Sequence, residues 1–172
     1  MYGESIPQGV SPKESFYDLS AVSISGDTLS MSIYKGKKIL IVNVASKCGY
    51  TPQYKDLQDL SENYKDKIVV LGFPSNDFLW QEPGSNQDIA TFCSIRYGVA
   101  FPMFEKVKVR GKDKHPIYQW LSEENKNGWN KKSPSWNFYK FLLDEEGKLI
   151  GKFGPKVLPA SNDIIQLIEQ EQ

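Results

Sequence analysis

Residues 39–45 constrain the fold more than any other segment of this chain. They read Ile-Leu-Ile-Val-Asn-Val-Ala, a nearly unbroken apolar run. A strand of this kind is usually covered on both faces, which is typical of a central strand in an α/β sheet. Thr51-Pro52 follows a short polar stretch and is typical of a helix start, with an N-cap residue and a proline at the first helical position. The sequence therefore predicts a buried strand that runs directly into a helix.

Patterns along the rest of the chain predict further strands and helices in a mixed α/β order. Further strands are expected at residues 16–23 and 28–33, which form a hairpin around Gly26-Asp27, and at 68–73, 103–110, 138–143 and 149–153. Apolar residues at helical spacing predict helices after Pro52 and at residues 86–97, 115–124 and 164–168. A parallel strand–helix–strand unit followed by an antiparallel hairpin gives a mixed central sheet with helices on both faces. We therefore predict an α/β protein of thioredoxin-like fold with an N-terminal β-hairpin, one domain over residues 1–172, and a loose segment at residues 1–15.

Composition excludes several classes of function. Lys and Arg together number 21, as do Asp and Glu, so bulk charge does not favour a nucleic-acid partner. One histidine, two cysteines and the absence of a Cys-x-x-Cys pair do not support a metal site or a thioredoxin-type dithiol. No apolar run reaches signal-peptide or membrane-spanning length. We expect a cytoplasmic protein with no cofactor and no integral membrane association.

Cys48 is the first candidate for chemistry. It lies between the predicted strand and helix, where backbone N–H groups and Lys47 favour thiolate over thiol. The thiolate is the nucleophilic form of cysteine. The alternative is that Cys48 is an unreactive buried cysteine, which is the commoner situation for a single cysteine.

Four segments give this chain a resemblance to a known family. They are Asn43 to Thr51, Gly72-Phe73-Pro74-Ser75-Asn76-Asp77-Phe78 with Gln81-Glu82-Pro83-Gly84, Phe101-Pro102-Met103-Phe104, and Ser135-Trp136-Asn137-Phe138-Tyr139-Lys140-Phe141-Leu142. In their order along the chain and in their residues, these segments resemble the glutathione peroxidase family, from about Phe16 to the C-terminus. The match of four segments in register is far more specific than any one of them.

The resemblance implies a catalytic set. Cys48 matches the peroxidatic residue, which is selenocysteine in some members and cysteine here. Gln81 matches the catalytic glutamine, and Trp136 and Asn137 match the catalytic tryptophan and asparagine. Amide and indole N–H groups are neutral donors, so they stabilise a thiolate without forming an ion pair. The implied reaction is reduction of hydrogen peroxide or of organic and lipid hydroperoxides, with a sulfenic acid formed on Cys48.

Cys93 decides how that sulfenic acid is reduced. Its context resembles the resolving cysteine of the family branch that thioredoxin reduces, which implies a Cys48–Cys93 disulfide reopened by a thioredoxin-like dithiol. Cys93 also falls on the apolar stripe of its helix with Ile89 and Phe92, where an unreactive core cysteine would lie. Two alternatives therefore stay open, a glutathione-dependent peroxidase with one active cysteine and a peroxide sensor that passes oxidation to a partner protein.

Two departures from the usual family pattern, and one feature of length, bear on the site. Ser75 stands where many thiol-type members have a cysteine, which is generally not the resolving one. Leu79-Trp80 replaces the usual glycines before the glutamine, which alters the expected rim of the active site. The short stretch from Leu121 to Trp136 resembles members that lack the insertion used for tetramer formation, which implies a monomer with an open site.

Overall fold

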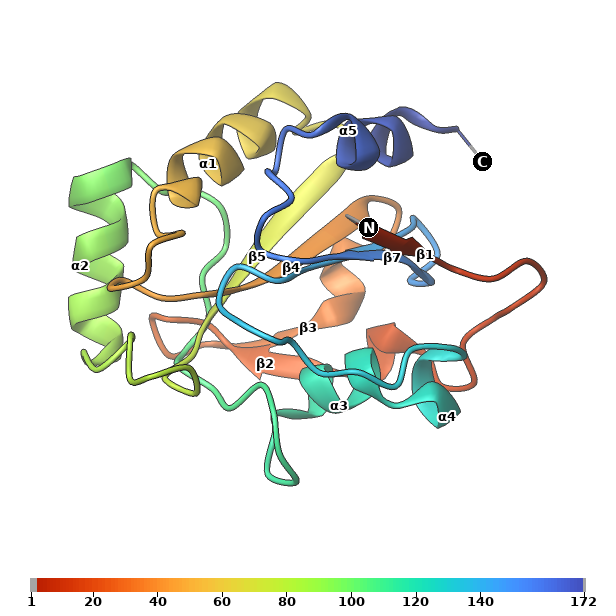
Figure 1. The fold of residues 1–172 in the computed structure, drawn as a ribbon, viewed down its shortest axis with the longest axis horizontal. Helices are drawn as coiled ribbons and strands as arrows, with labels where there is room; N and C mark the ends of the chain where they lie inside the picture. Colours follow the sequence, from red (N-terminus) through yellow and green to blue (C-terminus); the bar gives the residue numbers. More distant parts are fainter. Residues whose placement is uncertain (1–2, 172) are drawn as a thin grey trace.

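A five-stranded mixed sheet forms the centre of the protein (Figure 1). The computed structural model describes residues 3–171. Strand β4 (Lys38–Val44) pairs in parallel with β5 (Ile68–Pro74) at one end of the sheet. On its other side β4 pairs antiparallel with β6 (Lys140–Leu143), followed by β7 (Leu149–Phe153) and β1 (Gly3–Ser5). The buried strand predicted at residues 39–45 is therefore central.

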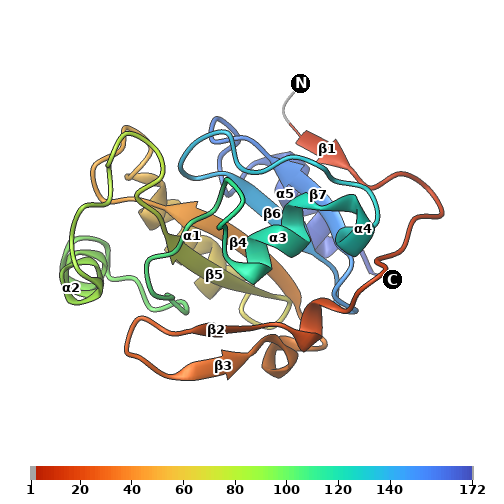
Figure 2. The ribbon, with the colours of Figure 1, turned by 90° about the horizontal axis from the view of Figure 1, so that it is seen from below.

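Each face of the sheet carries its own apolar core. Side chains alternate along β4, so Leu40 and Val42 face one way while Ile39 and Ile41 face the other. Helices α1 (Gln53–Asn63) and α5 (Asn162–Glu169) cover the first face. Helix α3 (Pro116–Ser122) and the hairpin of β2 (Ser20–Val22) and β3 (Thr28–Ser30) cover the second (Figure 2). The predicted mixed sheet and the helices on both faces are confirmed. The N-terminal hairpin forms but is shorter than predicted, because Phe16–Asp18 and Met31–Tyr34 are 3-10 helices.

Helix α2 (Asn86–Tyr97) lies at the β5 end of the molecule, beside α1 (Figure 1). Ser85 and Asp88 form a capping box at its start, and Gly98 ends it in the left-handed conformation with φ 59°. The short helix α4 (Glu124–Asn127) directly follows α3. These elements match the helices predicted at residues 86–97 and 115–124.

Two further expectations about strands and loops are wrong. Within the segment expected to be loose, Gly3–Ser5 forms the edge strand β1 on β7. Backbone hydrogen bonds make this pairing, so residues 3–5 contain no apolar pattern that would predict a strand. Residues 103–110 form no strand, because Met103 bridges only to Gly72 and Phe104 only to Ser23. This segment lies between the central sheet and the hairpin and pairs with each at a single point.

Candidate active site

Cys48 lies in a turn between β4 and α1, with 9% of its surface exposed. Its backbone N–H donates to the Thr51 hydroxyl over 3.0 Å, and that hydroxyl donates to the Ala45 carbonyl over 2.8 Å. The Tyr50 N–H donates to the Cys48 sulfur over 3.4 Å. The sequence placed Thr51 as the N-cap, but α1 begins at Gln53 and the Thr51 side chain closes the cysteine turn instead. A backbone donor therefore points at the sulfur.

Gln81 and Asn137 are brought together from distant parts of the chain. The Asn137 amide N–H donates to the Gln81 side-chain oxygen over 2.9 Å. The backbone carbonyl of Gln81 accepts from the Lys47 N–H over 3.0 Å, which joins its loop to the cysteine turn. Because the Gln81 amide uses its oxygen toward Asn137, its NH2 group stays the donor end. This orientation suits a site whose reactant is an anion.

Trp136 and Asn137 are held by a sharp backbone turn before β6. Phe138, the next residue, has φ 62°, and its N–H donates to the Asn43 carbonyl over 2.6 Å. The Asn43 side chain donates in turn to the Trp136 carbonyl over 3.0 Å. Asn43 is a positioning residue that our sequence reasoning missed, although a polar residue within an apolar strand was the available signal.

Lys140 supports the same turn from inside the protein. It is fully buried, and its ammonium donates to the Phe138 carbonyl over 2.8 Å. Burial lowers the pKa of this ammonium to about 7. The bond satisfies the carbonyl of Phe138, the residue in the left-handed conformation, and so it helps to fix the turn that carries Trp136 and Asn137.

Cys93 lies in the interior of α2 and is 2% exposed. It belongs to the same apolar cluster as Cys48, against which Trp136 also packs, and both cysteines are free thiols. Burial raises the pKa of the Cys93 thiol to about 11, while the neighbouring Tyr54 opposes that shift. Tyr54 packs on Phe92 and Tyr97 of α2 with ring centroids 6.5 and 5.5 Å apart. In this state Cys93 is a protonated thiol in a packed helix.

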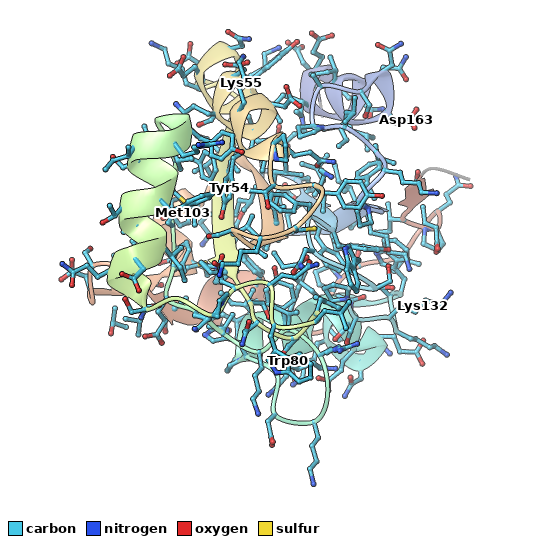
Figure 3. The ribbon with its side chains drawn as sticks, turned by 60° about the vertical axis from the view of Figure 1, so that its left-hand side comes forward. Tyr54, Lys55, Trp80, Met103, Lys132 and Asp163 are labelled. Carbon is cyan, nitrogen blue, oxygen red and sulfur yellow. The ribbon has the colours of Figure 1, made fainter. Side chains whose placement is uncertain are left out.

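Leu79 and Trp80 form the outer part of the loop before Gln81. Both have φ 52°, in the left-handed region that favours glycine. Their side chains are 67% and 76% exposed, and Figure 3 shows Trp80 at the end of the molecule away from Lys55 of α1. This loop therefore holds two residues other than glycine in a conformation that favours glycine, and it presents two exposed apolar side chains.

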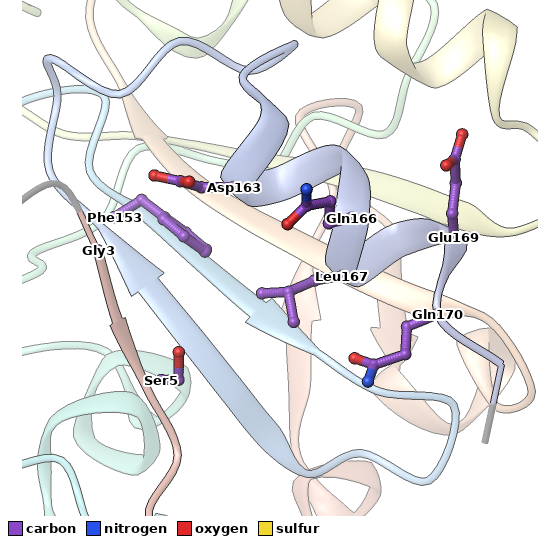
Figure 4. A pocket seen from close by; sticks show the side chains of 8 residues that line it. All are labelled: Gly3, Ser5, Phe153, Asp163, Gln166, Leu167, Glu169 and Gln170. Atoms are coloured by element: carbon purple, nitrogen blue, oxygen red, sulfur yellow. The ribbon is translucent and has the colours of Figure 1, made fainter.

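None of the predicted site residues lines the cavity of about 680 Å³ between α5 and the β1–β7 edge (Figure 4). Its lining is mostly polar and contains no cysteine. Within residues 3–171 no group of three His, Cys, Asp or Glu side chains is arranged to hold a metal ion. None of the helices in this part of the chain is both long and apolar enough to cross a membrane.

Comparisons with known proteins show which family this chain resembles in sequence. The family model for glutathione peroxidase matches residues 16–122. A glutathione peroxidase from Lactococcus lactis subsp. cremoris is 51% identical over 145 residues, covering 84% of this chain and 92% of that protein. The glutathione peroxidase-like peroxiredoxin 2 of Saccharomyces cerevisiae is 45% identical over 150 residues, covering 87% of this chain and 93% of that protein.

Solved structures show the same fold. The apo form of Trgpx has a TM-score of 0.68 and 38% identity, covering 91% of this chain and 96% of that one. A DsbF homologue from Corynebacterium diphtheriae has a TM-score of 0.66 and 18% identity, covering 98% of this chain and 92% of that one, which supports the fold alone.

A thioredoxin-like fold with a cysteine in the turn after its central strand defines the class of thiol-dependent oxidoreductases. Within that class the matched family model and the similarity to named members are decisive. The chain belongs to the glutathione peroxidase family, in its cysteine-type branch, and is a peroxidase.

Proposed function

We propose that Cys48 is the nucleophile that reduces hydroperoxides in this protein. The observation that carries the proposal is the hydrogen bonding of the cysteine turn. The Tyr50 N–H donates to the Cys48 sulfur, and the backbone N–H of Lys47 donates to the Gln81 carbonyl. The thiolate attacks the distal peroxide oxygen, the O–O bond breaks, and Cys48 becomes a sulfenic acid. The departing alkoxide or hydroxide takes a proton and leaves as alcohol or water.

In this mechanism Gln81, Trp136 and Asn137 stabilise the charge that develops during the attack. An amide NH2 or an indole N–H aimed at the reacting atoms stabilises both the thiolate and the departing oxyanion. Asn137 orients Gln81 through the bond of 2.9 Å between their amides. Their neutrality matters, because a fixed positive charge would hold the thiolate in an ion pair.

We further propose that Cys93 resolves the sulfenic acid and that a thioredoxin-like dithiol reduces the resulting disulfide. Membership of both thiols in one apolar cluster supports this pairing. Disulfide formation requires Cα atoms within about 7 Å, so α2 must open locally when Cys93 attacks. Hydrogen peroxide and organic or lipid hydroperoxides are the proposed substrates, and the protein is proposed to act as a monomer in the cytoplasm.

Cys93→Ser tests the resolving role. Reduced variant and wild type should each consume one equivalent of hydrogen peroxide rapidly, because the Cys48 turn is unchanged. The variant should then stop as a sulfenic acid, whereas wild type should yield a Cys48–Cys93 disulfide in the intact-mass spectrum and peptide map. Thioredoxin-driven turnover that is equal in both proteins would remove Cys93 from the mechanism.

The burial of Cys93 also favours a second candidate, a glutathione-dependent peroxidase with one active cysteine. A thiol with a pKa of about 11 inside a helix is a poor nucleophile near neutral pH. In that mechanism glutathione would attack the Cys48 sulfenic acid, and Cys93→Ser would turn over at the wild-type rate with glutathione. A coupled assay with thioredoxin and with glutathione, each on both proteins, distinguishes the two mechanisms and also a sensor, which would show oxidation without rapid recycling.

A further inference from the structure

Helix α2 has few buried side chains for an element that carries a cysteine of the proposed mechanism. Of its 12 residues two are buried, Ile89 with 1% of its surface exposed and Cys93 with 2%. An element that buries few apolar side chains opens locally at a low cost in free energy. The contacts that hold α2 in place therefore determine how often Cys93 is released for its proposed attack on Cys48.

The beginning of α2 is held by polar contacts. The Lys106 ammonium donates to the carbonyls of Glu82 and Gly84 over 3.2 and 2.6 Å. The backbone N–H of Lys106 donates to the Asn86 side-chain oxygen over 2.9 Å. The capping box adds two hydrogen bonds of 3.1 Å within the first turn. The first turn is therefore tied both to the loop before the helix and to the segment after it.

The end of α2 is held by aromatic packing against α1. Tyr54 of α1 is fully buried and lies beside α2 (Figure 3). Its ring centroid is 6.5 Å from that of Phe92 and 5.5 Å from that of Tyr97, and the latter two centroids are 5.9 Å apart. Phe92 directly precedes Cys93, and Tyr97 follows it by about one helical turn. The three rings therefore meet at the part of α2 that contains Cys93.

A polar contact from α1 supports the same end. The Gln58 side-chain oxygen accepts from the Ala100 N–H over 2.8 Å, just beyond the helix. Between these residues and the helix, the Val99 N–H donates to the Cys93 carbonyl over 3.1 Å. Release of Cys93 therefore requires the loss of the ring contacts and of the bond to Gln58, but it does not require the first turn of α2 to open.

Tyr54 is the fixed side of this contact. On α1, its ring packs edge-on against Phe138 of the active-site turn, with centroids 5.4 Å apart and an interplanar angle of 89°. Its position is therefore set by α1 and by the central sheet, and not by α2. Phe92 and Tyr97 form the side that can move away.

We propose that Tyr54, Phe92 and Tyr97 form a latch that keeps Cys93 inside the protein, and that opening of this latch sets the rate of disulfide formation. This inference rests on the proposed resolving role of Cys93. When the two rings of α2 leave Tyr54, the second half of the helix unwinds while its first turn stays bound to Lys106. Cys93 reaches the Cys48 sulfenic acid only in this open state, so the observed rate is proportional to the fraction of molecules that are open.

Tyr97→Leu tests the latch, because it removes one ring and keeps an apolar side chain. Two aromatic pairs are lost, which should raise the open fraction by about tenfold. When reduced protein is mixed with one equivalent of hydrogen peroxide, sulfenic acid should form at the wild-type rate. The Cys48–Cys93 disulfide, followed by mass spectrometry, should then form about tenfold faster than in wild type.

Hydrogen exchange of the reduced protein gives an independent measure of the same opening. In Tyr97→Leu the amides of residues 93–97 should exchange faster than in wild type, by the same factor as disulfide formation. The amides of residues 89–91 should exchange at the wild-type rate, because the contacts of Lys106 are unchanged. An equal rise at residues 89–91 would overturn the proposed release of the second half of α2 alone.

Three further variants define which contact acts. Tyr54→Phe keeps the ring and removes the hydroxyl, and it should form the disulfide at the wild-type rate. Ile95→Leu is a matched control on the same helix, at a position that is 82% exposed, and it should also behave as wild type. Gln58→Ala removes the acceptor for Ala100 and should speed disulfide formation by about fivefold, the usual value of one hydrogen bond.

The outcomes separate this inference from the proposed function. Disulfide formation in Tyr97→Leu that is no faster than in wild type would overturn the latch and leave Cys93 as the resolving residue. An acceleration in Tyr54→Phe as large as that in Tyr97→Leu would also overturn it, because the hydroxyl and not the ring would then hold the helix. Absence of the Cys48–Cys93 disulfide in wild type would overturn both proposals. If Tyr97→Leu fails to fold by circular dichroism, Phe92→Leu removes the other ring of α2 and carries the same test.

Discussion

The two cysteines of this protein occupy opposite kinds of environment. Cys48 lies in an irregular turn, where the Tyr50 N–H donates to its sulfur. The loop that carries Gln81 is hydrogen-bonded to this turn through the Lys47 N–H, and the Gln81 side chain in turn accepts from Asn137. Cys93 lies in the middle of a capped helix, packed under aromatic rings, with a thiol pKa raised to about 11.

The difference teaches how one residue type can take two roles. Irregular backbone leaves N–H groups free to stabilise an anion, whereas a helix interior uses its N–H groups for its own hydrogen bonds. Cys48 therefore lies where a backbone N–H reaches its sulfur. Cys93 lies buried in a packed helix, so its proposed attack on Cys48 requires a change in conformation first.

The largest expected effect is at Cys48. Cys48→Ser should lower peroxidase activity to below about 1% of wild type, because a hydroxyl has no accessible anionic form at neutral pH. Thermal unfolding should stay close to wild type, since the side chain is small and the turn is closed by Thr51. Activity well above that level in a folded variant would mean that another group carries the chemistry.

Removal of single donors should have the next largest effect. Gln81→Ala and Trp136→Phe should each slow the reaction of reduced enzyme with hydrogen peroxide by about 100-fold, the usual cost of losing one preorganised donor. Gln119→Ala is a matched control, because that amide bonds only to the Lys114 carbonyl outside the site. Unchanged kinetics in either variant would reduce that residue to a structural role.

The pH dependence of the free energy of unfolding should report the raised pKa of the Cys93 thiol. A thiol that titrates at about 11 in the folded protein and at about 9 in the unfolded chain keeps its proton longer when folded. Stability is therefore unaffected below pH 9 and falls between pH 9 and 11, by about 1.4 kcal/mol per pH unit. Urea unfolding of reduced protein from pH 8 to 10 should show a smaller fall in Cys93→Ala than in wild type.

The smallest expected effect lies in the loop before Gln81. Trp80→Gly should leave the free energy of unfolding unchanged or raise it by up to about 1 kcal/mol, because glycine relieves the cost of φ 52° while adding freedom to the unfolded chain. Its rate with hydrogen peroxide should equal that of wild type. A loss of more than about 1 kcal/mol in urea unfolding would show that the exposed indole makes stabilising contacts.

Much of the fold was predictable because its signals are local. The apolar runs at residues 39–45 and 68–73 predicted the two parallel strands, and helical spacing predicted α2. The four motif segments indicated the family and the candidate residues before any geometry was known. Such patterns reflect the burial and the periodicity of a segment, and both can be read from the residues of that segment alone.

Tertiary structure alone decided the features that join distant segments. The sequence could not show that Gly3–Ser5 would pair with β7, or that Thr51 would close the cysteine turn instead of capping the helix. Nor could it show that Glu82 would be buried beside the cysteine turn, in a cavity that Ser46 and Lys47 also line. Backbone pairing and the burial of a single polar side chain depend on which remote segments approach, and only the packed chain fixes that approach.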